Sequence, residues 1–548
     1  MTTTTTTSSI AYALPLSLAI LSIALYVHRR YVRYASLAKA PIAPAHSFFL
    51  KYFGIVPPPS EKETHDALSH FLIRVGRQDT RVSPVSVCWS IFGTPLVIVN
   101  TLKGIKDVLI EGQSRTSRSK GKAASVEKGP QVQRGMMIRL VHHLVFGGMN
   151  LNNTVGEDWR WRRHVLLPSF QPKQLVPHLL PYVASRAREL LDTFTRAAAS
   201  GQAIELDDLF TDLTMDVINF YLYGRKDLNY AIVGGKRNMK SLEVWLPFGL
   251  NRTKWAQKSF KPSRDRLKHF IHDSLDRALQ DYHTALADYE ASGTPPSRRV
   301  YRSVAACAFA SGRYGEDRVD LVNDLLALTF AGYDTTAHTL SFCFAELARH
   351  PDLQEQLFQE VRAVLGPAPL DPATITAEKL AKMPLVTAVY KEALRMYPAV
   401  VFIPMHVNRA IQVDGTVVPE GAAVWCNVRG IQMNPALFPE PEKFDPSRWL
   451  RPVVVETTED AAFDHFGTDT TDHVITPDTQ YTFPDLPFTL GQHACIGKNL
   501  ATLELRTTIA CTVNEFKFNL AQDCIIDTKV VLTTKPRHGV WVHFEKRT

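Results

Sequence analysis

The chain is poor in cysteine, and its seven cysteines show no paired spacing. An odd and scattered set argues against a disulfide framework and favours a reducing compartment. Zinc-finger spacing is absent as well, and no run of lysine and arginine is interleaved with aromatic residues. Nucleic acid is therefore the least favoured partner for the net charge of +8. The net positive charge is better explained by binding to an anionic membrane or to an acidic protein partner.

Charge is also missing at the amino terminus. Residues 1–9 carry no charged side chain, residues 10–27 form an apolar run, and basic residues follow at 28–33. As a helix the run would be about 27 Å long, close to the ~30 Å hydrocarbon core of a bilayer. A secretory signal would carry its positive charge before the apolar run. The pattern predicts an uncleaved single-pass transmembrane helix with the body in the cytosol, and a cleaved signal is the alternative.

Internal repeats are lacking too, which favours one large catalytic unit over an array. We expect an anchor with its basic flank at 1–40, a linker stiffened by prolines at 41–60, and a catalytic domain at 61–548. Residues 453–485 contain no lysine or arginine and many acidic residues. This stretch is predicted to be an acidic insertion that forms a solvated surface loop.

Cys495 lies in a loop bracketed by glycines, just before a helical pattern at residues 498–510. A cysteine binds metal as its thiolate, which the N–H groups of a helix start favour. Gly491 and Gly497 let the backbone turn tightly and approach a flat ring closely. Cys495 is therefore a candidate ligand of a haem iron. The alternative is the usual role of a lone cysteine, a small buried apolar side chain.

Two further patterns place polar groups on helix faces. Trp159 and Arg163 are four apart, so an indole N–H and a guanidinium share one face and can bind a carboxylate. Glu392 and Arg395 are three apart and can form an ion pair. The alternatives are a solvated basic helix face and an exposed salt bridge of little energetic value.

A long helical pattern runs from about residue 320 to residue 350 and ends before a proline. Gly332 weakens the middle of this helix, and the hydroxyl of Thr335 can donate to the carbonyl of Ala331. The local groove that results, with Asp334 beside it, suits proton delivery. A capping or turn element is the alternative.

Apolar residues after the Glu392 helix are candidates for the wall of a pocket. An apolar loop at 246–250 could touch the membrane or roof that pocket, and a satellite core cluster is the alternative for this loop. Such a pocket would suit a lipophilic ligand. His338 follows Asp334 by one turn and is interpreted as core or pocket wall. Arg409 precedes a predicted hairpin with its turn at Asp414–Gly415. The predicted pocket residues are Val401, Phe402, Ile403 and Ala331, with a loop at 246–250.

Taken in order, these motifs resemble those of the cytochrome P450 superfamily. The loop that starts at Phe488 is similar to its cysteine-ligand signature, Phe-x-x-Gly-x-Arg-x-Cys-x-Gly, except that His493 stands in place of the arginine. Residues 331–336 resemble its oxygen-activation motif, Ala-Gly-x-Asp-Thr-Thr. The Trp-x-x-x-Arg and Glu-x-x-Arg patterns occur in the family's order too, so the resemblance extends from about residue 159 to residue 510.

The resemblance implies a mainly α fold with a smaller β-rich part, preceded by one transmembrane helix. It also implies haem b between the Asp334 helix and the Cys495 helix, with the Cys495 thiolate as axial ligand. The cofactor-binding loop would include Phe488, Gly491 and Gly497. The other implied roles are haem-propionate binding by Trp159, Arg163, His493 and Arg409, oxygen activation by Thr335 and Asp334, and a buried structural triad of Glu392, Arg395 and Arg448.

The same resemblance implies an enzyme of the endoplasmic reticulum membrane with its catalytic domain in the cytosol. Electrons would come from NADPH through NADPH–cytochrome P450 reductase, with cytochrome b5 as a second candidate donor. A basic surface that includes Lys498 would attract an acidic partner. The reaction would be hydroxylation or another oxidation of a lipophilic small molecule by O2, with secondary metabolism as the candidate setting.

Two other functions stay open at the level of sequence. A haem-thiolate isomerase or dehydratase would need no external electrons, although Asp334 and Thr335 favour oxygen activation. A membrane-anchored binding or redox-sensing protein with a reactive Cys495 would need no haem. Because a histidine is charged only if its neighbours raise its pKa, His493 predicts loose haem retention that weakens as pH rises.

Overall fold

A computed structural model of the chain describes residues 67–77, 83–89, 95–113, 130–135, 148–224, 254–292, 303–315, 318–450, 486–530 and 532–547, with single positions within 21–40 and at 139 and 146. The predictions for the linker, the loop at 246–250, the acidic insertion and most of the anchor lie outside these residues. Within the described part of the chain, no helix combines the length and the apolar character needed to cross a bilayer.

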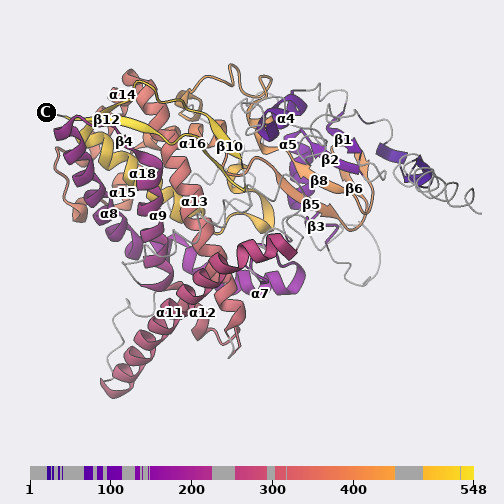
Figure 1. Ribbon diagram of the computed structural model, residues 1–548, viewed down its shortest axis with the longest axis horizontal. Helices are drawn as coiled ribbons and strands as arrows, with labels where there is room; N and C mark the ends of the chain where they lie inside the picture. Colours follow the sequence, from indigo (N-terminus) through magenta and orange to yellow (C-terminus); the bar gives the residue numbers. More distant parts are fainter. Residues whose placement is uncertain are drawn as a thin grey trace, which may run out of the picture.

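Helices dominate the described residues, and strands form a smaller part, as the sequence predicts (Figure 1). The helices are α4 (Ala67–Gly76), α5 (Leu102–Lys106), α7 (Gly156–Leu166), α8 (Pro172–Ser200), α9 (Leu206–Tyr223), α11 (Lys254–Ser292), α12 (Val304–Ala310), α13 (Val319–Arg349), α14 (Pro351–Leu365), α15 (Ala377–Ala381), α16 (Pro384–Met396), α17 (Val428–Gln432) and α18 (Lys498–Glu515). The strands are β1 (Val85–Trp89), β2 (Pro95–Val99), β3 (Val132–Arg134), β4 (Ile204–Glu205), β5 (Ile403–Val407), β6 (Ile411–Val413), β7 (Thr416–Val418), β8 (Ala423–Cys426), β9 (Phe516–Leu520), β10 (Thr528–Val530), β11 (Thr534–Pro536) and β12 (Trp541–Lys546).

The long helix α13 is the centre of the helical part and packs against α9, α16 and α18 (Figure 1). It ends at Arg349 because Pro351 cannot continue it, and that proline opens α14 instead. A Cβ added at Gly332 would lie 2.6 Å from the Ile218 side chain on α9. The glycine that weakens the helix pattern in the sequence therefore lets α9 and α13 approach closely.

A five-stranded sheet of order β1-β2-β8-β5-β3 forms the opposite side of the molecule, with the β2–β8 pair parallel and the other pairs antiparallel (Figure 1). Side chains alternate between its two faces. One face, with Ile98 and Trp425, packs on Phe71 and Leu72 of α4. The other face forms a separate aliphatic cluster. The predicted hairpin is confirmed by β6 and β7, which pair around a turn with positive φ at both central residues.

Two small sheets near the carboxyl terminus complete the helical part. Strand β12 pairs with β9 and β4 and lies against α8, while β10 and β11 form a hairpin whose β11 strand contacts α13. That hairpin places Thr533 and Lys535 beside the middle of α13. The protein thus brings residues from near its carboxyl terminus to its central helix.

Candidate functional site

The loop that carries Cys495 is held in one backbone conformation. The N–H of Cys495 donates to the carbonyl of Phe488 at 2.8 Å. Gly491 has a φ of +71°, and a Cβ there would lie 2.3 Å from the carbonyl oxygen of Leu109. Only glycine satisfies both conditions. Gly497 then precedes the first turn of α18 and directs its N–H toward the Cys495 sulfur.

Cys495 has exposed surface, yet surrounding protein desolvates its thiol. Burial raises the pKa of that thiol, and the Gly497 N–H opposes this effect. The positive charges of Arg163, Arg134 and, more weakly, Lys498 act in the same direction as the N–H. Exposed surface combined with strong desolvation is expected of a group that faces an enclosed space.

Two guanidinium groups lie on the same side of the site as Cys495. Arg134 ends strand β3 and donates from Nε to Nδ1 of His493 at 3.3 Å and from Nη1 to the carbonyl of Asn152 at 3.0 Å. Arg163, on α7, lies over the ring of Trp159, whose centroid is 5.8 Å away. Among the described residues neither guanidinium has a carboxylate partner.

Desolvation and mutual repulsion act on these cations. Burial, followed by the charge of Arg163, lowers the pKa of Arg134 to about 10. Burial also lowers the pKa of Arg163. Two partly desolvated cations without carboxylates are costly unless an anion compensates them. A flat ligand that carries two carboxylates and binds a thiolate, as haem does, fits this set of donors.

The surroundings of His493 disfavour a charge on its ring. Burial, Arg134 and Arg163 lower its pKa to about 2. Its ring packs on Trp159 with a centroid distance of 4.0 Å. The low pKa argues against the expectation that His493 is charged, and the pH dependence of haem retention stays a prediction.

Arg134 is the residue that sequence reasoning missed. It belongs to no motif and lies 359 positions before its partner His493. Arg409 is the additional donor that the resemblance implies, but it follows β5 and its backbone N–H donates to Gln131, just before β3. Gln131 and Arg134 are three positions apart, a distance of about 10 Å in extended chain. The structure thus places Arg134, at the other end of β3, beside His493.

Residues in the middle of α13 adopt the predicted arrangement in part. The hydroxyl of Thr335 donates to the carbonyl of Ala331 at 3.0 Å. Asp334 is buried and accepts a hydrogen bond from Thr533. Burial raises the pKa of Asp334, yet His338 and Thr533 outweigh it and hold the pKa below its usual value. His338 is buried as expected, but it is ionically paired rather than a plain core residue.

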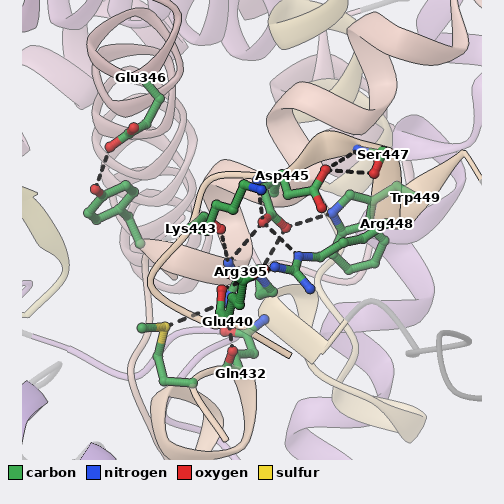
Figure 2. Close-up of polar contacts among 12 residues, drawn as sticks. Glu346, Arg395, Gln432, Glu440, Lys443, Asp445, Ser447, Arg448 and Trp449 are labelled. Carbon is green, nitrogen blue, oxygen red and sulfur yellow. Dashed lines mark hydrogen bonds and ion pairs between the residues drawn. The ribbon is translucent and has the colours of Figure 1, made fainter. Parts of the chain in front are cut away.

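The structure also brings Glu392, Arg395 and Arg448 together in the interior. Figure 2 shows Arg395, Arg448 and Trp449 of this network. Arg395 donates to both carboxylate oxygens of Glu392, at 2.8 and 2.9 Å, and Arg448 donates to one of them at 3.3 Å. The indole N–H of Trp449, absent from the predicted set, donates to the other oxygen at 2.9 Å. Arg395 further donates to the carbonyl of Gln432, so the network joins α16 to the segment before the cysteine loop.

The predicted pocket residues separate into different surroundings. Val401 is buried in the cluster that packs on α4. Phe402 stacks on Trp425 with a centroid distance of 4.0 Å. Ile403 begins β5 and packs on the aliphatic cluster, and Ala331 is half-buried on α13 beside Thr335. Val401 and Phe402 therefore support the sheet, and pocket lining stays a prediction for these residues.

Comparison with known proteins decides the family. The family model described as Cytochrome P450 matches residues 85–541. The chain belongs to the cytochrome P450 family. Similar proteins include "Cytochrome P450 4A10" of Mus musculus, 28% identical over 71% of this chain and 73% of its own. "Cytochrome P450 4X1" of Rattus norvegicus is 26% identical over 74% and 77%, and "Cytochrome P450 734A5" of Oryza sativa subsp. japonica is 24% identical over 89% and 84%.

Membership in the cytochrome P450 family establishes the class of reaction. The enzyme is a haem-thiolate monooxygenase that acts on lipophilic substrates with O2 and electrons from a redox partner. Its cofactor is haem held by a cysteine thiolate. The donors around Cys495 fit that cofactor, since they combine a thiol with two cations that have no other carboxylate partner among the described residues.

Proposed function

We propose that Cys495 would hold the iron of haem b as a thiolate and that the enzyme oxidises a lipophilic small molecule with electrons that NADPH supplies through a reductase. The observation that carries the proposal is the convergence of Cys495, Arg134 and Arg163 at one place from three distant segments. When bound, haem supplies the redox centre at which O2 is reduced, and an anionic sulfur ligand favours cleavage of the O–O bond.

Each residue of the site has a proposed task. The N–H of Gly497 and the nearby cations stabilise the thiolate of Cys495. Arg134 and Arg163 would bind the haem propionates. Trp159 packs against His493 and forms part of the wall of the site. The neutral His493 fixes the side chain of Arg134 by accepting its Nε–H. Arg134, at the end of β3, thus provides the permanent positive charge that the family motif has as an arginine at the position of His493.

Thr335 and Asp334 handle protons in this proposal. The hydroxyl of Thr335 is anchored on Ala331, which leaves its oxygen lone pairs free to accept a hydrogen bond. Asp334 is one position away on α13 and passes protons through that hydroxyl. The triad of Glu392, Arg395 and Arg448 keeps α16 and the chain before the cysteine loop in register.

The setting of the enzyme completes the proposal. The apolar run at 10–27 anchors the protein in the endoplasmic reticulum membrane with the catalytic domain in the cytosol. NADPH–cytochrome P450 reductase and cytochrome b5 are the proposed electron donors, and Lys498 forms part of the basic surface that they contact. Secondary metabolism is the proposed context. If charge reversal at Lys498 leaves the salt dependence of reductase-supported turnover unchanged, that residue is not part of the contact.

The carbon monoxide difference spectrum of the reduced protein tests the ligand. We expect the far-red-shifted Soret band of a thiolate-ligated haem in the wild type and its loss in Cys495→Ser. Cys307→Ser is the matched control, since Cys307 lies on α12, and it should keep the band. Retention of the band in Cys495→Ser would exclude this cysteine. Substrate-dependent NADPH consumption with reductase separates a monooxygenase from an isomerase or dehydratase, which would consume none.

A further inference from the structure

A buried histidine joins α9 to α13 through two carboxylates. Nδ1 of His338 lies 2.7 Å from Oδ1 of Asp207, and its Nε2 lies 3.4 Å from Oδ1 of Asp334. The first contact is a short hydrogen bond, and the second is an ion-pair contact slightly longer than a hydrogen bond. The side chain of His338 is 8% exposed. A ring in this position is flanked by an anion on each side.

Each of the two carboxylates also accepts a hydrogen bond from a hydroxyl group. Asp207, in the first turn of α9, also accepts from the Ser341 hydroxyl at 2.8 Å. Asp334 accepts on its other oxygen from Thr533, which precedes β11, and Lys535 on that strand adds positive charge. Through this cluster, Asp334 and His338 on α13 are connected to α9 and to the β10–β11 hairpin.

The charges in the cluster favour a cationic ring. Burial alone would lower the pKa of His338, but Asp207 and Asp334 outweigh it and raise the pKa to about 10. Burial raises the pKa of each carboxyl, and the ring outweighs this effect, so that the pKa of Asp207 and of Asp334 is lowered. The cluster consequently holds one imidazolium between two carboxylates at neutral pH.

We propose that His338 is a positioning residue that keeps Asp334 ionised and oriented beside Thr335, and that Asp207 serves as the counter-ion of His338. The inference rests on the proposed function for its catalytic meaning, because Asp334 there handles protons. Its consequence is that Asp334 starts each cycle as a base. The carboxylate must therefore acquire a proton before it can pass one to Thr335, and α9 belongs to the proton-handling machinery.

Infrared spectroscopy of the haem-loaded protein tests the charge of Asp334 without turnover. His338→Gln keeps a hydrogen-bonding side chain but removes the cation. We expect an additional carbonyl band of a protonated carboxylic acid near neutral pH, shifted in D2O and absent from the double variant His338→Gln/Asp334→Asn. Burial also raises the pKa of Glu504, so any carbonyl band from Glu504 would be common to the wild type and the variants, and the test is the difference between their spectra. Identical bands in wild type and His338→Gln over about pH 6 to 8 would overturn the proposal.

The pH profile of coupling, measured as product formed per NADPH consumed, gives the functional readout. Wild type should show no Asp334 ionisation near neutral pH, whereas His338→Gln should show a new one. Asp207→Asn keeps a hydrogen-bond acceptor for Nδ1 of His338 but removes the negative charge. We expect it to change the pH profile of coupling in the same direction as His338→Gln, by a smaller amount. His350→Gln is the matched control, because His350 lies at the end of α13 and binds the Glu346 carbonyl instead. A profile that moves equally in the control would contradict a specific role.

The two experiments separate the inference from the function. If the carbon monoxide spectrum lacks the thiolate signature, the proposed function fails even when the infrared band appears. If the enzyme turns over normally and the infrared band does not appear, the positioning role of His338 fails alone.

Discussion

The cation beside His493 is supplied by a side chain far away in the sequence. Arg134 donates to His493, and the charges of Arg134 and Arg163 both act on the Cys495 thiol. Position 493 therefore needs no charge of its own to retain a carboxylate-bearing ligand. The imidazole instead acts as a neutral acceptor that orients the guanidinium of Arg134.

We predict that Arg134→Gln speeds haem loss. A hydrogen bond to a charged group contributes about 1.5 to 3 kcal/mol, which corresponds to roughly ten- to hundredfold in rate. Transfer of haem to an apoglobin acceptor measures it. Arg160→Gln is the control on α7, because Arg160 pairs with Glu157 at the surface. Equal loss rates in the two variants would remove Arg134 from the site.

Substitution of His493 by arginine is a separate prediction. A third guanidinium beside Arg134 and Arg163 adds repulsion, so we expect His493→Arg to bind haem no more tightly than wild type. Wild-type haem affinity should be flat over about pH 6 to 8, because a histidine with its pKa held low does not titrate there. A clear fall in affinity across this range would show that His493 is protonated when haem is bound.

At the scale of elements, close packing of α9 on α13 depends on Gly332. Alanine there would place a methyl group within 2.6 Å of Ile218, and overpacking of this kind costs about 1 to 3 kcal/mol. We predict this loss of stability for Gly332→Ala in urea unfolding. The double variant Gly332→Ala/Ile218→Ala should be more stable than the sum of the single changes predicts. Strict additivity would show that α9 and α13 do not meet here.

The Glu392 network ties α16 to residues 432–449. We predict that Arg395→Ala lowers the free energy of unfolding by about 3 to 5 kcal/mol, because it leaves the buried Glu392 charge with one arginine. Arg277→Ala breaks an exposed ion pair with Asp273 on α11 and should cost less than about 1 kcal/mol. Chemical denaturation of both variants measures the difference. Similar losses would mean that the network is not buried in solution.

The local sequence pattern predicts helices and strands well in this protein, but it predicts contacts between residues distant in sequence poorly. The end of α13 and the β6–β7 hairpin follow from a proline and an Asp-Gly pair, which act on their own neighbours. Asp207 lies 131 positions from His338, and Arg134 lies 359 positions from His493. No local signal encodes such pairs. The sequence motif identifies Cys495, whereas the roles of Arg134 and Asp207 can be recognised only in the folded structure.

At the scale of the whole molecule, the ionic cluster makes stability depend on pH. The pKa of His338 is higher in the folded protein than in the unfolded chain, so protonation of this ring stabilises the fold. The stabilisation is complete below the pKa of the unfolded chain and is lost as pH rises through about 10. The lowered pKa of Asp207 and Asp334 contributes stability above their ordinary values and loses it as pH falls. We predict that His338→Gln loses less stability than wild type as pH rises from about 6.5 to about 10. Urea unfolding at several pH values across that range compares them, and parallel curves would argue against an imidazolium.

The two cations that face Cys495 also connect cofactor supply with folding. Any ligand that binds only the folded state stabilises it by mass action, in proportion to the logarithm of its free concentration. A ligand that neutralises Arg134 and Arg163 removes a repulsion that the folded chain otherwise carries. The amount of intact enzyme that a cell accumulates should therefore follow its haem supply as well as its rate of protein synthesis.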